Sequence, residues 1–286
     1  MRGARPLAAL EASVAEGVAA RPGDVLLAAV SGGPDSVALA ALLGRCVRQA
    51  GATLALAHVN HALREGAWQD EGVVLALGAA LGVRVIARSL ALGSAAEARL
   101  RDERYAALAE IARGLGARRI FTAHHAQDQT ETVLLALFRG TGPDGLLGLP
   151  SVRELPDGIV VERPLLGIEP AALRAYCASE HLAYAVDPSN GDLAYRRNAV
   201  RAALVDLRAS FPHLDAAVAR CADILRAERA AAPRAALRER LRVEVRAAAG
   251  DTRDVPFERL DAVARALERG TPGRHFLRRG VEAIVE

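Results

Sequence analysis

The stretch VLLAAV-SGGPDS-VALAALL, residues 25–43, decides the fold of this chain. An apolar strand is predicted from Val25 to Val30, a glycine-rich turn spans Ser31 to Ser36, and an apolar helix follows at once. The start of a helix leaves free backbone N–H groups, and the positive end of the helix dipole lies at the same point. Glycines let the backbone approach a ligand closely. The stretch therefore predicts a phosphate-binding loop between a strand and a helix.

The side chains of this loop favour a magnesium-bound nucleotide. Ser31 and Ser36 add hydroxyl donors to the glycine backbone. Asp35 is the exception, because a carboxylate repels a phosphate unless a divalent cation lies between them. An ordinary turn with two glycines is the alternative. The chain contains no Lys, so the GxxxxGK[ST] pattern of P-loop kinases and GTPases is excluded.

Strand and helix patterns alternate through the first two-thirds of the chain. Further strands are predicted at residues 54–59, 83–87 and 119–123, and helices at residues 68–81, 95–113 and 128–138. Such alternation is typical of an α/β domain with a doubly wound, mostly parallel sheet. In this fold, a ligand lies at the carboxyl ends of the strands.

The last part of the chain is expected to be a smaller all-helical domain. After a turn-rich stretch at residues 140–158, a small unit at residues 159–198 completes the first domain, and Arg/Ala/Leu-rich helical segments follow. We place the boundary near residue 208, which gives domains 1–207 and 208–286. Residues 206–286 hold 16 Arg and 13 acidic residues, which accounts for the whole net charge of +3. This excess permits a polyanionic partner, although solvated helix faces have the same composition.

Composition fits a globular protein without a membrane span. The chain has 286 residues, of which 51% are hydrophobic, and no apolar run reaches the roughly 18 residues that a membrane helix needs. The N-terminus lacks a signal-type core, so the cytoplasm is the default location. Three isolated cysteines form no CxxC pair and are expected to be buried and reduced. The sequence does not reveal the oligomeric state, and a homodimer is one alternative.

A second polar motif, HHAQDQTET at residues 124–132, follows a predicted strand and begins a helix. Asp128 and Glu131 lie one turn apart there, on the same side of the helix. Two such carboxylates can bind a metal or an ammonium group, although acids in a first turn also stabilise the helix dipole. A zinc site that includes His124 and His125 is a further alternative, but HxxH and HExxH spacings are absent.

Two shorter motifs complete the set. The segment HVNHALR, residues 58–64, follows the second strand, where polar side chains are well placed for a base or a phosphate. Glu97, Arg101, Arg104 and Tyr105 share one helical face, which could equally be a salt-bridged surface.

The order of the motifs resembles that of the tRNA(Ile)-lysidine synthetases, which are pyrophosphate-loop ATPases. The resemblance covers residues 25–204 and rests on SGGPDS, HVNHALR, the E…R…RY helix, HHAQDQTET, RGTGPDGLLGL, RPLL, DPSNGD and YRRN. It implies ATP-dependent adenylylation of the wobble cytidine of tRNA(Ile) with a CAU anticodon at its carbon-2 oxygen. The amine of free L-lysine then displaces AMP.

The resemblance also implies roles for individual residues. The ATP-binding residues would be Ser31, Gly32, Gly33, Pro34, Asp35, Ser36 and His58. Asp35 would hold Mg²⁺, Asp128 and Glu131 would form the acidic pair for lysine or metal, and Arg197 is similar to the arginine of the family that reacts with tRNA. Outside the resemblance, the excess of Arg in the helical tail, residues 208–286, leads us to expect that the tail binds the tRNA.

The sequence departs from the family pattern in three places. Ala62 replaces the usual glycine of HVNHGLR, and Gln127 replaces an acid that could bind a metal. The chain ends at Glu286, whereas many members continue into another small domain. Two other functions stay open: a tRNA-thiolating enzyme, which would want paired or nucleophilic cysteines, and a non-catalytic adenylate- or RNA-binding homologue.

Overall fold

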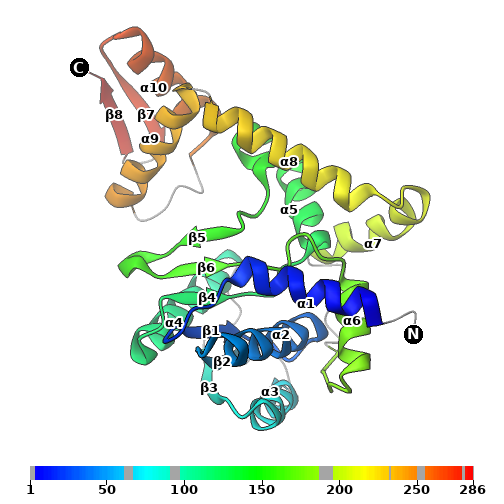
Figure 1. The fold of residues 1–286 in the computed structure, drawn as a ribbon. Coiled ribbons are helices and arrows are strands. Elements are labelled where there is room, and N and C mark those ends of the chain that lie inside the picture. The colour runs from blue at the N-terminus through cyan, green and yellow to red at the C-terminus, as the bar shows by residue number, and fades with distance from the viewer. Residues whose placement is uncertain are drawn as a thin grey trace. The chain divides into compact units, whose positions relative to one another are not determined.

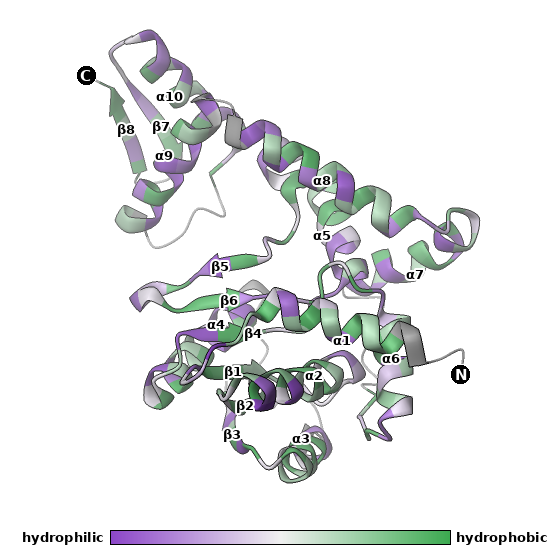
Figure 2. Ribbon diagram, viewed as in Figure 1, coloured by the Kyte–Doolittle hydropathy of each residue, from purple (hydrophilic) through white to green (hydrophobic). Residues whose placement is uncertain are grey.

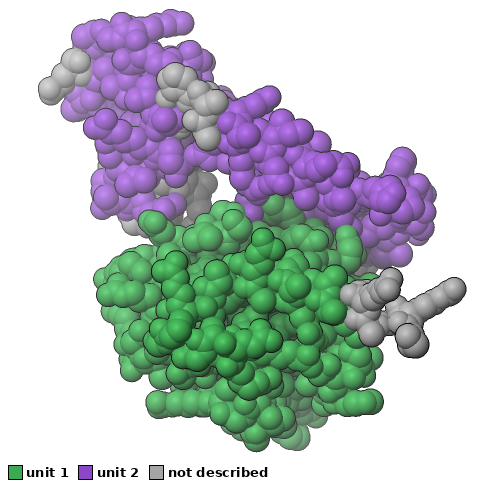
Figure 3. All heavy atoms as spheres, viewed as in Figure 1, with its two compact units in different colours: residues 1–129, 150–193 green, residues 130–149, 194–286 purple. Residues whose placement is uncertain are grey.

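The chain forms two compact units. The computed structural model describes residues 4–60, 67–90, 97–186, 196–231, 233–249, 255–278 and 281–285. The first unit comprises residues 1–129 and 150–193, and the second comprises residues 130–149 and 194–286 (Figure 3).

A six-stranded sheet forms the centre of the first unit (Figure 1). Its strands are β1 (Val25–Ala29), β2 (Thr53–Asn60), β3 (Arg84–Ser89), β4 (Arg119–Phe121), β5 (Val152–Glu154) and β6 (Val160–Glu162). Their order is β3-β2-β1-β4-β6-β5, and every neighbouring pair is parallel except β5 and β6. The predicted doubly wound α/β fold is confirmed. The antiparallel edge strand β5 was not predicted, because it lies in a turn-rich stretch and is only 3 residues long.

Both faces of the sheet are buried at its centre, which explains why the central strands are continuous apolar runs. Along β1, Leu26 and Ala28 pack into one core and Leu27 into the other. The first core is covered by α1 (Ala4–Val18), α2 (Pro34–Ala50), α3 (Ala67–Leu81) and α6 (Pro170–Ser179), and the second by α4 (Glu97–Leu115). Figure 2 shows the hydrophobic character of β1 and α2.

The order of the strands places the two polar motifs at one edge of the sheet. β1 pairs with β2 on one side and with β4 on the other, so the chain reverses its winding direction between β1 and β4. Because these strands are parallel, the loops that follow β1 and β4 leave the sheet at the same edge. Ligands of open α/β sheets bind at such a switch point.

The second unit is mostly helical but includes a β-hairpin. It contains most of α5 (Ala126–Phe138), a short 3₁₀ helix (Pro143–Leu147), α7 (Arg196–Ser210), α8 (Leu214–Ala231), α9 (Pro233–Ala249) and α10 (Phe257–Arg269). The prediction of an all-helical tail is wrong, because β7 (Gly273–Arg278) and β8 (Val281–Val285) form an antiparallel pair. Leu277 of β7 and Val285 of β8 alternate with more exposed neighbours and join the core of α9 and α10. This period of two is a strand signal.

The division by packing differs from the boundary expected near residue 208. That residue lies within α7, all of which belongs to the second unit together with residues 130–149. Residues 130–149 come before β5 and β6 in the sequence, so composition along the chain gives no reason to assign them to the C-terminal unit.

A buried carboxylate holds residues 130–149 within the second unit. Asp144 is 4% exposed and lies 2.7 Å from Nη1 of Arg242 and 3.4 Å from Nε of both Arg229 and Arg238. The three arginines come from α8 and α9. An acid from the 3₁₀ helix is thus surrounded by guanidinium groups that lie about 85 to 98 residues later in the chain.

We expect Asp144→Asn to lower the free energy of unfolding by about 3 kcal/mol, the lower end of the range for breaking a buried ion pair. The three arginines reach solvent in part, which limits the cost. Chemical denaturation measures the effect. Asp157→Asn is the control, because Asp157 is exposed and its pair with Arg113 is also exposed. Equal unfolding midpoints for the two variants would contradict the role of Asp144.

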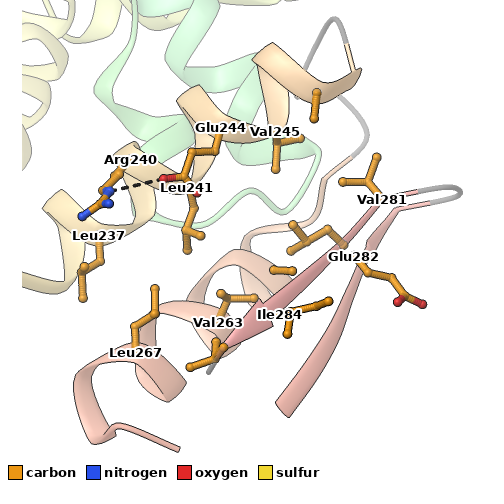
Figure 4. A pocket seen from close by; sticks show the side chains of 14 residues that line it. Leu237, Arg240, Leu241, Glu244, Val245, Val263, Leu267, Val281, Glu282 and Ile284 are labelled. Atoms are coloured by element: carbon orange, nitrogen blue, oxygen red, sulfur yellow. Dashed lines mark hydrogen bonds and ion pairs between the residues drawn. The ribbon is translucent and has the colours of Figure 1, made fainter. Parts of the chain in front are cut away.

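A cavity of about 380 Å³ lies within the second unit (Figure 4). Its lining is mainly aliphatic and comes from α9, α10, β7 and β8, with Leu241 and Val263 among its side chains. Arg240 and Glu244, 3.3 Å apart, form an ion pair within this lining. None of the site residues predicted from the sequence lines this cavity.

The structure also tests the predicted burial of the cysteines and the predicted absence of a membrane-spanning helix. Cys46 and Cys177 are buried as expected, but Cys221 is exposed on α8, so the prediction for Cys221 is wrong. Among the described residues, no helix is long and apolar enough to cross a membrane.

Candidate active site at the carboxyl ends of the strands

The loop after β1 is held by its own hydroxyl groups. Ser36 Oγ donates to the carbonyl oxygen of Gly33 at 2.9 Å and accepts from the backbone N–H of Ser31 at 3.1 Å. The two serine hydroxyls are 3.1 Å apart. The single hydroxyl hydrogen of Ser36 is therefore used within the loop, so the ligand-facing donors of this segment are mainly backbone N–H groups.

Glycine is required where this loop passes close to α3. Gly32 has φ of +95°, and a Cβ added to it would lie 3.1–3.2 Å from backbone and side-chain atoms of Asp70. Gly33 is the N-cap of α2 and offers no side chain to cap it, while Pro34 occupies the first turn. The N-terminus of α2 thus has the form that binds phosphate in other proteins.

Asp35 lies in the first turn of α2, where its carboxylate is partly exposed. Its Oδ2 is 3.6 Å from Nε2 of His125, and its buried Oδ1 has no hydrogen-bond partner in the part of the chain that the structure describes. No cluster of three or more His, Cys, Asp or Glu side chains suited to a metal occurs among these residues. One open carboxylate oxygen beside an anion site fits Mg²⁺ bound mainly by phosphate and water.

His58 is buried at the end of β2, next to the loop. Its Nδ1 lies 2.9 Å from the carbonyl oxygen of Val30. Because a carbonyl only accepts, Nδ1 carries the proton in the neutral ring, and Nε2 is left as an acceptor. Nε2 is buried and has no hydrogen-bond partner among the described residues. His61 to Arg64, the rest of this motif, lie outside the described residues.

The segment after β4 brings a second carboxylate to the same place. His125 is 8% exposed, and its Nε2 lies 3.5 Å from Oδ2 of Asp128 and 3.6 Å from Oδ2 of Asp35. The backbone N–H of His125 also donates to Asp128 Oδ2 at 3.0 Å, which fixes the start of α5. One imidazole therefore bridges the acid of the phosphate loop and the acid of the second motif.

The link through His125 was not predicted. The sequence suggested His124 and His125 only as ligands of an alternative zinc site, and His124 Nδ1 instead lies 2.9 Å from the hydroxyl of Thr122. The useful signal was the position of His125 immediately after a strand and three residues before Asp128.

Glu131 has different partners from Asp128, although both lie on α5. Glu131 is fully buried, and its two oxygens accept from Nε and Nη2 of Arg201 at 2.8 and 3.1 Å. Arg197 Nε lies 3.3 Å from Glu131 Oε2, and Arg197 Nη2 donates to Thr132 Oγ1 at 3.0 Å. These contacts join α5 to α7 within the second unit. A shared cation site for Asp128 and Glu131 stays a prediction.

Comparison with known proteins assigns the chain to a family. A family model described as the PP-loop domain matches residues 6–208. The tRNA(Ile)-lysidine synthase of Gloeobacter violaceus is 42% identical over 209 residues, which cover 72% of this chain and 64% of that protein. The tRNA(Ile)-lysidine synthase of Salinispora arenicola is 38% identical over 238 residues, with 80% and 70% covered. The chain belongs to the PP-loop family, in the group of the tRNA(Ile)-lysidine synthases.

The match to these PP-loop relatives covers only part of their length. It covers 64% of the Gloeobacter violaceus protein and 39% of the tRNA(Ile)-lysidine synthase of Thermus thermophilus. Among solved structures, the U34-tRNA thiolase NcsA from Methanococcus maripaludis, with its [4Fe-4S] cluster, has a TM-score of 0.65 at 16% identity. The alignment covers 75% of this chain and 76% of that one, and it supports the fold alone.

Proposed function

We propose that this protein is an ATP-dependent ligase that joins L-lysine to the wobble cytidine of tRNA(Ile) with a CAU anticodon, through an adenylylated tRNA. The observation that carries the proposal is the position of His125, within 3.6 Å of both Asp35 and Asp128. This arrangement places an acid suited to a magnesium-nucleotide beside an acid suited to an amine. Family membership supports the same reaction.

The first step would use the loop after β1. The cytidine carbon-2 oxygen attacks the α-phosphorus of ATP, and pyrophosphate leaves. The backbone N–H groups at the N-terminus of α2 bind and orient the phosphates, and Gly32 and Gly33 permit their close approach. A magnesium ion at Asp35 would offset phosphate charge in this step. His58 Nε2 can accept a hydrogen bond from an amino or hydroxyl group of the nucleotide.

The second step would use the segment after β4. The lysine amine attacks carbon-2 of the activated base, AMP leaves with the carbon-2 oxygen, and the amine loses a proton. Asp128 is partly buried and beside His125, which suits it to bind the ammonium form, to accept its proton and to orient the free amine for attack. Within the second unit, Glu131 of α5 would hold Arg197 of α7 in place for contact with the tRNA.

The cysteines argue against the thiolation alternative. They lie on three separate helices, and burial raises the pKa of Cys177 to about 11, with the charge of nearby Asp35 adding to the effect. Burial also raises the pKa of Cys46. A raised pKa keeps a thiol neutral, whereas sulfur transfer needs a thiolate.

Incorporation of labelled lysine into tRNA(Ile), with pyrophosphate release followed in parallel, tests the proposed reaction. Both signals should depend on ATP, Mg²⁺ and this tRNA. Pyrophosphate release without lysine incorporation would favour another PP-loop tRNA-modifying reaction. Binding of ATP or RNA with neither signal would favour the non-catalytic homologue. A cytoplasmic location and a homodimer stay predictions.

We further propose that the second unit, including residues 208–286, binds the tRNA. Arg220 on α8 and Arg246 on α9 are exposed and suited to phosphate contacts. Replacing both by Gln should weaken tRNA binding and reduce the slope of log K against log[salt] by about 1.4 to 1.8, while ATP binding stays unchanged. Filter binding at several salt concentrations measures this slope. An unchanged slope would contradict phosphate contacts at these two positions.

A further inference from the structure

Arg163, in the RPLL motif, is a buried guanidinium without an acidic partner. It is 4% exposed. Its Nη1 donates to the carbonyl oxygen of Pro150 at 2.8 Å, and its Nη2 donates to the hydroxyl of Tyr105 at 3.3 Å. Its Nε is buried without a hydrogen-bond partner, and no carboxylate of the described residues forms an ion pair with it. Among the described residues, the guanidinium of Arg163 is therefore hydrogen-bonded only to two neutral oxygens.

Such a group is unusual, because buried charges in proteins are normally paired or bound to a ligand. An arginine cannot avoid the problem by losing its proton, since its pKa is too high. The two neutral bonds fix the plane of the guanidinium and leave the buried Nε–H without a hydrogen-bond partner among the described residues. A planar donor fixed in this way is typical of sites that bind carboxylate or phosphate.

The surroundings add positive charge. The guanidinium carbons of Arg153 and Arg104 lie 5.1 and 5.7 Å from the centre of the Tyr105 ring, whose hydroxyl bonds Arg163. Three arginines from α4, β5 and the end of β6 thus gather around one tyrosine.

The position of Arg163 links it to the proposed active site. It directly follows β6, whose last residue, Glu162, pairs with Phe121 of β4 and accepts a hydrogen bond from the backbone N–H of Thr122. Arg163 therefore adjoins the segment after β4 that carries His125 and Asp128.

We propose that Arg163 binds an oxyanion of a substrate of this enzyme, either the carboxylate of the free amino acid or a phosphate of the RNA. This inference rests on the proposed function. Tyr105 and Pro150 act as positioning groups that hold the guanidinium in place. Two motifs noted in the sequence, the E…R…RY helix and RPLL, thereby meet at one binding group, beside Pro150.

The test compares Arg163→Gln and Arg163→Lys with the wild-type protein, and Arg113→Gln, an exposed arginine of the same unit, is the matched control. Loss of a charge-assisted contact should raise the KM of the affected substrate by about ten- to a hundredfold. The KM for lysine, the KM for tRNA and the rate of adenylylation are measured separately. The control should leave all three unchanged.

The two sources of the oxyanion are distinguished with 1,5-diaminopentane, which is lysine without its carboxylate. If Arg163 binds the carboxylate, the wild-type protein should prefer lysine over the diamine and Arg163→Gln should lose that preference. If it binds an RNA phosphate, the preference should persist while the affinity for tRNA in filter binding falls.

Three results would overturn the inference. One is an unchanged KM for both substrates in a folded Arg163→Gln protein. Another is equal loss of every step in both variants. The last is unfolding of both variants, which would show that Arg163 has a structural role, through its hydrogen bonds to Pro150 and Tyr105. Absence of lysine incorporation by the wild-type protein would instead contradict the proposed function. The affinity of the Arg163 variants for tRNA would still test whether Arg163 binds an RNA phosphate.

Discussion

Asp35→Asn is expected to lower the rate of ATP-dependent tRNA adenylylation by about a hundred- to a thousandfold, the loss typical of removing one electrostatic group from an active site. The substitution keeps the shape of the side chain but removes the charge that would bind Mg²⁺. Asp35 is partly exposed and, among the described residues, approaches only His125 as an ionic partner, so the folded state should persist. Pyrophosphate release under tRNA saturation measures the rate.

Magnesium titration and unfolding experiments distinguish a metal-binding role of Asp35 from a structural one. A metal role predicts that excess Mg²⁺ partly restores the variant, and Asp157→Asn, at an exposed acid, should behave as wild type. Wild-type turnover by Asp35→Asn would exclude the metal role. A lost folded state would instead make Asp35 structural.

Asp128→Asn is expected to raise the lysine requirement by about ten- to a hundredfold while adenylylation stays near normal. The reason is that the substrate amine is cationic before it reacts, and Asp128 lies partly buried beside His125, where a charged contact is strong. Adenylylated tRNA and lysine-modified tRNA are measured separately over a range of lysine concentrations. A raised Mg²⁺ requirement with impaired adenylylation would show that Asp128 binds metal instead.

Glu131→Gln provides a comparison on the same helix. Glu131 is fully buried against Arg201, so its substitution should lower stability as well as the rate of the lysine step. A double-mutant cycle with Arg201→Gln tests this, because two residues that act through one ion pair have non-additive effects. Additive losses would favour a direct contact between Glu131 and a substrate.

Wild-type behaviour of Asp128→Asn and Glu131→Gln in both steps would show that these acids only stabilise the helix start.

The sequence was most informative where local rules act alone. A glycine-rich turn between an apolar strand and an apolar helix required no knowledge of the rest of the chain, and the structure has that turn between β1 and α2. Strand and helix alternation likewise predicted the parallel sheet, because hydrophobic period and length are local properties. The same reasoning missed β5 and the β7–β8 hairpin, since short strands have weak periodicity and depend on their partners.

The sequence by itself determined the fold class, the glycine-rich turn after β1 and the candidate acids. Tertiary structure decided which of these residues share partners. It brought Asp35 and Asp128 to the same side chain, His125. It also paired Glu131 with arginines of α7, and Asp144 with arginines of α8 and α9. In the part of the chain that the structure describes, it also left the buried Nε of Arg163 without a hydrogen-bond partner. The physical reason is that ion pairs and burial depend on distances between side chains far apart in the sequence, and charge type and spacing along the chain do not fix those distances.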